Sequence, residues 1–142
     1  MSIATGVAKA VASELKKQEF SLPFLCEMLV LPSFEPAELE QVRVTVVPQS
    51  LETERMTRSS VKYVVTVEIG IQRRIQGTKD ETVETMCGLV DEISDHLADT
   101  PLAEFPAAQW QRSENEPLYV PEHLSQKRAF TGVLTVKYVL YT

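Results

Sequence analysis

The sequence has few residues of the kinds that build catalytic, metal and disulfide-stabilised sites. Its 142 residues include two cysteines, two histidines and five glycines, and the glycines are scattered. A disulfide framework requires more cysteines and a secretory context. Phosphate-binding loops require glycines in patterns such as GxGxxG or GxxxxGK[ST], and neither occurs. We therefore expect no catalytic residue, no cofactor and no metal site.

Positive charge and long apolar runs are also scarce. Lysine and arginine number 14 against 20 acidic residues, a formal net charge of −6, which argues against a protein whose main task is to hold nucleic acid. No run reaches the about 18 apolar residues of a membrane span. The N-terminus lacks the basic region and apolar core of a signal peptide. We therefore expect a single cytoplasmic domain over residues 1–142, with Cys26 and Cys87 as buried free thiols.

The segment Ser60–Arg74 carries the clearest structural pattern. Its apolar residues occupy every second position, which places them on one face of a strand. Valine, isoleucine and tyrosine fit a pleated, half-buried surface. The run is long for a strand, so we expect it at the centre of an antiparallel sheet with one covered face. The apolar positions are Val61, Tyr63, Val65, Val67, Ile69 and Ile71.

Two further segments have helical spacing. Apolar residues recur every four positions over Ile3–Lys17, where Glu14 and the terminal lysines are expected to supply the polar side. A second helix is expected after Gly77, with Asp80 as its N-cap and Pro101 as its end. Its expected apolar stripe is Val83, Met86, Cys87, Val90, Ile93 and Leu97.

The remaining regular segments are expected to be strands. Together with the two helices they predict an α+β two-layer sandwich, a mainly antiparallel sheet of about four or five strands with two helices on one face. The last strand has two apolar faces, so a neighbouring subunit is expected to cover the second one. These strands are Phe20–Leu31, Gln41–Pro48, Ala107–Ser113 and Arg128–Tyr141.

The connection Gln49–Ser59 contains no glycine, proline, asparagine or aspartate, so it does not predict a tight hairpin turn. Two interpretations remain open for it. It is either a solvated charged loop or a projecting hairpin arm that docks to a partner. Arg55 and Arg58 lie near its tip, and Arg73 and Arg74 end the long strand, so these four arginines are candidates for electrostatic docking.

Candidate catalytic groups are weak. Neither His96 nor His123 lies in the spacing of a metal site. Glu114 and Glu116 form the most suggestive carboxylate pair, in a segment, Glu114–Leu124, that is expected to be a loop. An acidic chain offers such pairs by chance, and acid–base work requires their pKa values to be pushed apart. A small enzyme or ligand-binding module using the loop from Glu114 to His123 remains an alternative function.

Several segments together resemble a family of phage proteins. These are the amphipathic N-terminal helix, RVTVVP (43–48), the charged connection with RSS (58–60), the long strand ending in IGIQRR, and the tail from ENEPLYVPEHL to RAFTGVLTVKY. In length and element order the chain resembles the small neck and tail proteins of long-tailed bacteriophages, above all the tail terminator, or tail completion, proteins.

The resemblance implies a non-enzymatic structural protein of the virion, assembled in the host cytoplasm. Members of that family form a hexameric ring that caps the tail tube, stops its polymerisation and presents a surface to the head–tail connector. The implied partners are further copies of the chain, the tail tube protein and the connector or neck proteins. DNA would pass through the ring without specific binding, because an acidic ring repels phosphates. A head-completion protein or a tail tube subunit is the nearest alternative.

Overall fold

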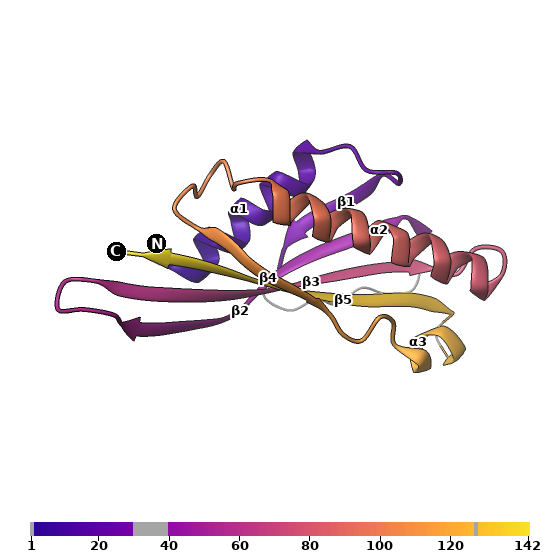
Figure 1. Cartoon of the computed structure of the whole chain (residues 1–142). Helices are drawn as coiled ribbons and strands as arrows, with labels where there is room; N and C mark the ends of the chain where they lie inside the picture. The colour runs from indigo at the N-terminus through magenta and orange to yellow at the C-terminus, as the bar shows by residue number, and fades with distance from the viewer. Residues whose placement is uncertain (1, 30–39, 127) are drawn as a thin grey trace.

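The computed structural model describes residues 2–29, 40–126 and 128–142. Its described strands form one five-stranded sheet in the order β1-β2-β3-β5-β4 (Figure 1). The strands are β1 (Phe24–Met28), β2 (Val42–Arg55), β3 (Val61–Arg74), β4 (Gln109–Asn115) and β5 (Ala129–Tyr141). The helices are α1 (Ile3–Lys17), α2 (Lys79–Asp99) and α3 (Pro121–Gln126).

Strand β3 lies at the centre of the sheet, as its alternating sequence predicts. It pairs antiparallel with β2 on one side and with β5 on the other, so that Ile69 lies between Val46 and Leu134. Strand β4 pairs antiparallel with β5, and β1 pairs parallel with β2. The predicted α+β class with a mainly antiparallel sheet is therefore confirmed. The central apolar side chains of β3 are fully buried; they are Val65, Val67, Ile69 and Ile71.

Helices α1 and α2 cover the same face of the sheet (Figure 1). Val7, Val11 and Leu15 of α1 are buried there, as their spacing predicts. The stripe of α2 is rotated slightly from the predicted one, because Leu89 is buried and Val83 is only partly so. The prediction that Glu14 lies on the polar side of the helix is wrong, because this residue is 8% exposed.

The N-cap of α2 is Thr78 and not Asp80. The Thr78 backbone is extended and its hydroxyl oxygen accepts a hydrogen bond from the Glu81 amide at 3.1 Å. A threonine in that conformation satisfies one of the amide groups that a helix N-terminus leaves free. Asp80 lies inside the first turn, where its charge still complements the helix dipole.

Helix α3 falls in the segment predicted as a loop. Pro121 is its first residue, a position where proline loses no hydrogen bond. The ring nitrogen Nδ1 of His123 lies 2.8 Å from the hydroxyl of Thr131, which pairs with Gln72 in β3. The alternation of β5 places Thr131 on the face opposite Phe130, away from α1 and α2. Part of the second face of β5 is therefore covered within the chain by α3.

Strand limits also differ from those that the sequence predicts. β2 does not stop at Pro48 but continues through a bulge to Arg55. β1 is shorter than the predicted segment Phe20–Leu31, whose last two residues lie outside the described residues. β4 begins and ends two positions later than predicted.

Two glycines in regular elements should respond oppositely to an added methyl group. A Cβ on Gly70 of β3 would lie 2.9 Å from the Thr45 hydroxyl oxygen, whereas a Cβ on Gly88 of α2 would meet no atom within 4 Å. Thr45 is 1% exposed and has little room to move. We expect Gly70→Ala to lower the free energy of unfolding by about 2 kcal/mol and Gly88→Ala to raise it by about 0.5–1 kcal/mol.

Urea unfolding of both glycine variants measures these changes. Adding Thr45→Ala to Gly70→Ala removes the clashing hydroxyl and should recover part of the loss. If Gly70→Ala is as stable as the parent chain, strands β2 and β3 can separate slightly at no cost, and the close approach is not a constraint.

Candidate docking surface

The hairpin formed by β2 and β3 extends beyond the two-helix layer as an arm (Figure 1). We define the arm as residues 50–66. It begins at the register shift between Pro48 and Ser50, where a bulge bends the strand and increases its twist. Residues 49–59 are all exposed. Of the two interpretations of Gln49–Ser59, the structure therefore shows a projecting hairpin; docking to a partner remains a prediction.

A compact turn closes the arm at its tip. The Met56 amide donates to the Ser60 carbonyl oxygen at 2.9 Å, and the Ser59 amide donates to the Thr57 hydroxyl at 3.3 Å. The Arg55 guanidinium donates to the Arg58 carbonyl oxygen at 3.2 Å and braces the turn. The predicted docking residues Arg55 and Arg58 are thus brought together on an exposed tip.

Among the described strands, the base of the arm is supported on one side only. β5 pairs with β3 as far as Lys62, and two backbone hydrogen bonds of 3.1 and 3.0 Å join Val61 to Thr142. On the other side, β1 pairs with β2 only from Val42 to Val46. Among the described strands, none pairs with the outer edge of the segment Ser50–Arg55. The arm therefore presents free backbone donors and acceptors along this edge.

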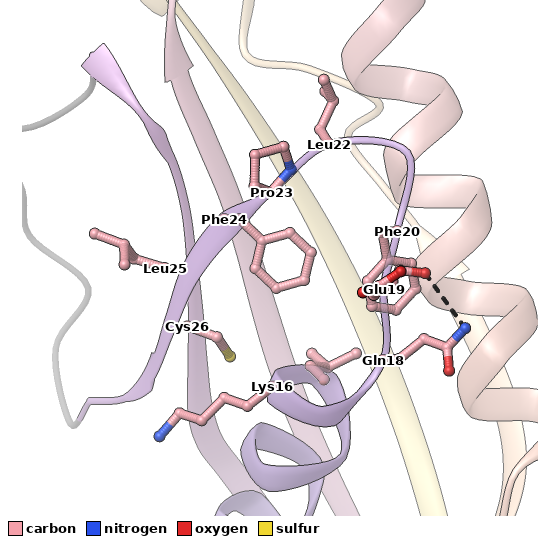
Figure 2. Close-up of a pocket in the computed structure, with 10 residues that line it drawn as sticks. Lys16, Gln18, Glu19, Phe20, Leu22, Pro23, Phe24, Leu25 and Cys26 are labelled. Carbon is pink, nitrogen blue, oxygen red and sulfur yellow. Dashed lines mark hydrogen bonds between the residues drawn. The ribbon is translucent and has the colours of Figure 1, made fainter.

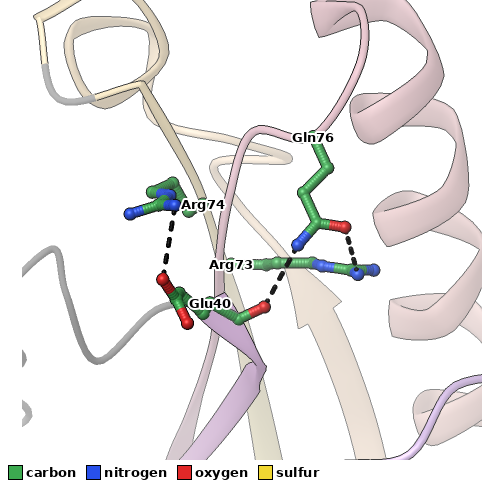
Figure 3. Close-up of polar contacts among 4 residues, drawn as sticks. All are labelled: Glu40, Arg73, Arg74 and Gln76. Atoms are coloured by element: carbon green, nitrogen blue, oxygen red, sulfur yellow. Dashed lines mark hydrogen bonds and ion pairs between the residues drawn. The ribbon is translucent and has the colours of Figure 1, made fainter.

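The other two predicted docking residues lie at the opposite end of β3 (Figure 3). The Arg73 guanidinium donates to Gln76 Oε1 at 2.7 Å, and Arg74 lies 3.5 Å from Glu40 Oε1. Gln76 completes the group by donating to the Glu40 carbonyl oxygen at 3.2 Å. These contacts connect the end of β3 with the start of β2.

The four arginines therefore form two separate pairs. β3 has 14 residues, and a strand rises about 3.3 Å per residue, so the two pairs are roughly 40 Å apart. Arg128 precedes Ala129, the partner of Arg74, and adds a third arginine at that end. Lys127, next to Arg128 in the sequence, lies outside the described residues.

Exposed apolar side chains mark a part of this surface that the sequence pattern did not indicate. Leu51 is 42% exposed, Met56 50% and Tyr141 56%, and all three lie on the arm or on the strand that supports it. Trp110 of β4 is 38% exposed. Leu51 and Thr53 alternate with Glu52 and Glu54, and this period of two was the signal that could have revealed the strand.

A buried polar group connects the two helices. His96 Nε2 of α2 lies 3.1 Å from Glu14 Oε1 of α1, and the two side chains are 16% and 10% exposed. The other ring nitrogen of His96 lies 3.4 Å from the Thr100 hydroxyl, and the Phe20 ring meets the imidazole edge-on. The Tyr138 hydroxyl is buried with no hydrogen-bond partner among the described residues; burial, and then the nearby Glu14 carboxylate, raise its pKa. The paired groups hold α1 against α2.

An open hollow of about 550 Å³ lies between the end of α1 and β1 (Figure 2). Cys26 lines it beside Phe20, Phe24 and Lys16. Burial raises the pKa of the Cys26 thiol to about 12, an effect that Lys16 partly opposes. A thiol with that pKa is protonated near neutral pH, so it is a poor nucleophile there.

The alternative enzyme site gains no support from the geometry of its residues. Glu114 lies 3.3 Å from the Arg112 guanidinium, and His123 contacts Thr131 on the sheet. The hollows beside β1, α2 and β4 are lined by residues outside 114–123. In residues 2–29, 40–126 and 128–142, no three His, Cys, Asp or Glu side chains are grouped so that they would hold a metal ion.

No family model matches the chain, and no curated protein matches it at a significant level. Within the described part of the chain, no helix is both long enough and apolar enough to cross a membrane.

Proposed function

We propose that this chain is a structural assembly protein of a long-tailed bacteriophage, a tail terminator that caps the tail tube as a homo-oligomeric ring. The observation that carries the proposal is the arm, a paired hairpin whose outer strand and turn, residues 50–59, are exposed. A helix-covered sheet holds its base, and its tip presents Arg55, Arg58 and Met56. An exposed arm with paired backbone suits docking better than catalysis, because it offers a large surface and no enclosed site.

In this function the ring would bind the growing end of the tube, stop polymerisation and offer a surface to the head–tail connector. We expect six copies, as the sequence resemblance implies, and a location in the virion. The acidic balance of the chain suits a conduit through which DNA passes without being held. Another neck component or a tube subunit remains the second candidate, and a tube subunit would polymerise alone into long tubes.

Charge reversal at the arm tip tests the proposal. Arg55 and Arg58 are exposed, so Arg55→Glu with Arg58→Glu should leave the fold intact and reduce capping of purified tail tubes at least tenfold. A loss of this size corresponds to about 1.4 kcal/mol of binding free energy. Electron microscopy of tubes mixed with the variant measures the capped fraction and the tube length.

The matched control is Lys9→Glu with Lys17→Glu on α1, which changes the net charge by the same amount away from the arm. Circular dichroism and thermal unfolding should show that both variants fold. Normal capping by the arm variant, or an equal loss in the control, would contradict the proposed role of the tip.

A further inference from the structure

Two edges that no described strand pairs with match each other. One is the outer edge of the arm, Ser50–Arg55, and the other is the outer edge of β4, Gln109–Asn115, whose pairing partner on the inner side is β5. Neither segment contains proline, and most of their side chains are exposed. Unpaired strand edges of this kind are ready to receive a further strand.

The strand directions allow one copy to continue the sheet of another. β2 and β5 run in one direction and β3 and β4 in the other, because each neighbouring pair among them is antiparallel. If a second copy is placed in the same orientation, its β4 runs antiparallel to β2 of the first. The helices of both copies then lie on the same face of the joined sheet. A head-to-tail contact of this type uses two different surfaces and repeats until it closes into a ring or grows as a filament.

The side chains define a register for this contact. Glu52 and Arg112 both lie on the face away from α1 and α2, since their neighbours are Val64 and Lys137. Opposite charges directly across an antiparallel pair are favourable. Placing Glu52 opposite Arg112 puts Leu51 opposite Ser113 on the helix-covered face.

The same register covers two exposed apolar side chains. The pairing register of β4 shifts between Trp110 and Arg112. With Arg112 opposite Glu52, Trp110 would therefore lie opposite Thr53 of the other copy, next to Leu51. Trp110 and Leu51, 38% and 42% exposed in the single chain, would then shield each other from water. Within one chain, Arg112 contacts Glu114 at the exposed surface, and such an ion pair is weak. In the contact between copies, Glu52 of the other copy can replace Glu114 as the partner of Arg112.

We propose that copies of this chain associate head to tail by antiparallel pairing of the arm edge Ser50–Arg55 with the β4 edge of a second copy, with Glu52 opposite Arg112. The inference deepens the proposed function, because it names the surfaces through which the ring closes. The number of copies in the ring rests on the proposed function.

Disulfide trapping tests the register directly. In a background of Cys26→Ala and Cys87→Ala, one chain carries Leu51→Cys and a second carries Ser113→Cys. Opposed residues on paired strands have Cα atoms about 4.5–5.5 Å apart, within the range of a disulfide. Mild oxidation of the mixture should give a cross-linked dimer on a non-reducing gel, and neither chain alone should do so.

The control pairs Ser113→Cys with Leu118→Cys, an exposed leucine outside both edge segments. Cross-linking of Leu51→Cys with itself would indicate a symmetric arm-to-arm contact and would overturn the inference. So would the absence of the mixed cross-link at the highest soluble concentration, or equal cross-linking in the control.

Charge exchange provides an independent readout. Arg112→Glu should weaken association about threefold per contact, and adding Glu52→Arg should restore it. Light scattering over a concentration series measures the change. If the chain caps tail tubes but gives no mixed cross-link, the edge pairing fails while the proposed function stands. If the cross-link forms but tubes are not capped, the function fails and the pairing stands.

Discussion

His96→Ala should lower the free energy of unfolding by about 3 kcal/mol, because it leaves the Glu14 carboxylate buried without its partner. In the parent chain the two groups are 3.1 Å apart and little exposed, with the Phe20 ring against the imidazole. Removing one member of a buried pair costs far more than removing a pair at the surface, because the remaining charge has lost its water and gains nothing in return. Urea unfolding at neutral pH measures the change.

The matched histidine variant is His123→Ala, which removes a single contact with Thr131 and should cost about 1 kcal/mol. Replacing both members of the buried pair, as Glu14→Leu with His96→Leu, should recover much of the loss, because well-packed apolar groups often substitute for a buried pair. If His96→Ala lowers the free energy of unfolding by less than about 1 kcal/mol, the pair contributes no more than a contact at the protein surface. The helices would then be held by apolar packing alone.

Leu134→Ala should lower the free energy of unfolding by about 4 kcal/mol. Leu134 lies between Ile69 of β3 and Asn115 of β4, and its side chain is 1% exposed beneath the helices. The variant loses the transfer free energy of the removed atoms, and a cavity remains because strands held on both sides cannot collapse into it.

Leu118→Ala provides the same chemical change at a leucine that is 56% exposed. It should alter stability by less than about 0.5 kcal/mol. Denaturant unfolding of both variants, with equal slopes, isolates the effect of burial. Equal losses in the two variants would contradict the placement of Leu134 in the core.

The central strand and the two covering helices could be predicted from sequence because their apolar residues keep one period over many positions. Val65 to Ile71 alternate without a break, and Val7, Val11 and Leu15 recur at helical spacing. Such patterns arise because one face of the helix or strand is buried, so apolar residues must recur at the period of that element. The α+β class follows from them.

The outer strand of the arm was harder to predict because its side chains are exposed on both faces. In the segment 50–55 the alternation is between leucine or threonine and glutamate, which resembles a charged loop as much as a strand. Its pairing is fixed by β3, whose own pattern continues through Val61 and Tyr63. Helix α3 was missed for a similar reason, since Pro121 marks a loop as readily as a first helical turn.

The buried pair was missed although the sequence contains a signal for it. Glu14 is seven residues after Val7, and His96 is three residues after Ile93, so both fall on the apolar faces of their helices. A polar residue on such a face in each of two helices predicts a contact between them. The exposure of Leu51 and Trp110 to solvent could not be predicted from the sequence, because it depends on where the helix layer ends.

The sheet order also determines when the fold can be completed during synthesis. In the described sheet β4 pairs only with β5, although β5 is made after it, and β5 must enter between β3 and β4. A nascent chain can thus form the β2–β3 hairpin early, but the second edge of β3 stays unpaired until β5 emerges from the ribosome. Chains arrested before β5 is made would expose this edge of β3 and leave β4 without its partner strand. Folding intermediates of this kind aggregate and are bound by chaperones.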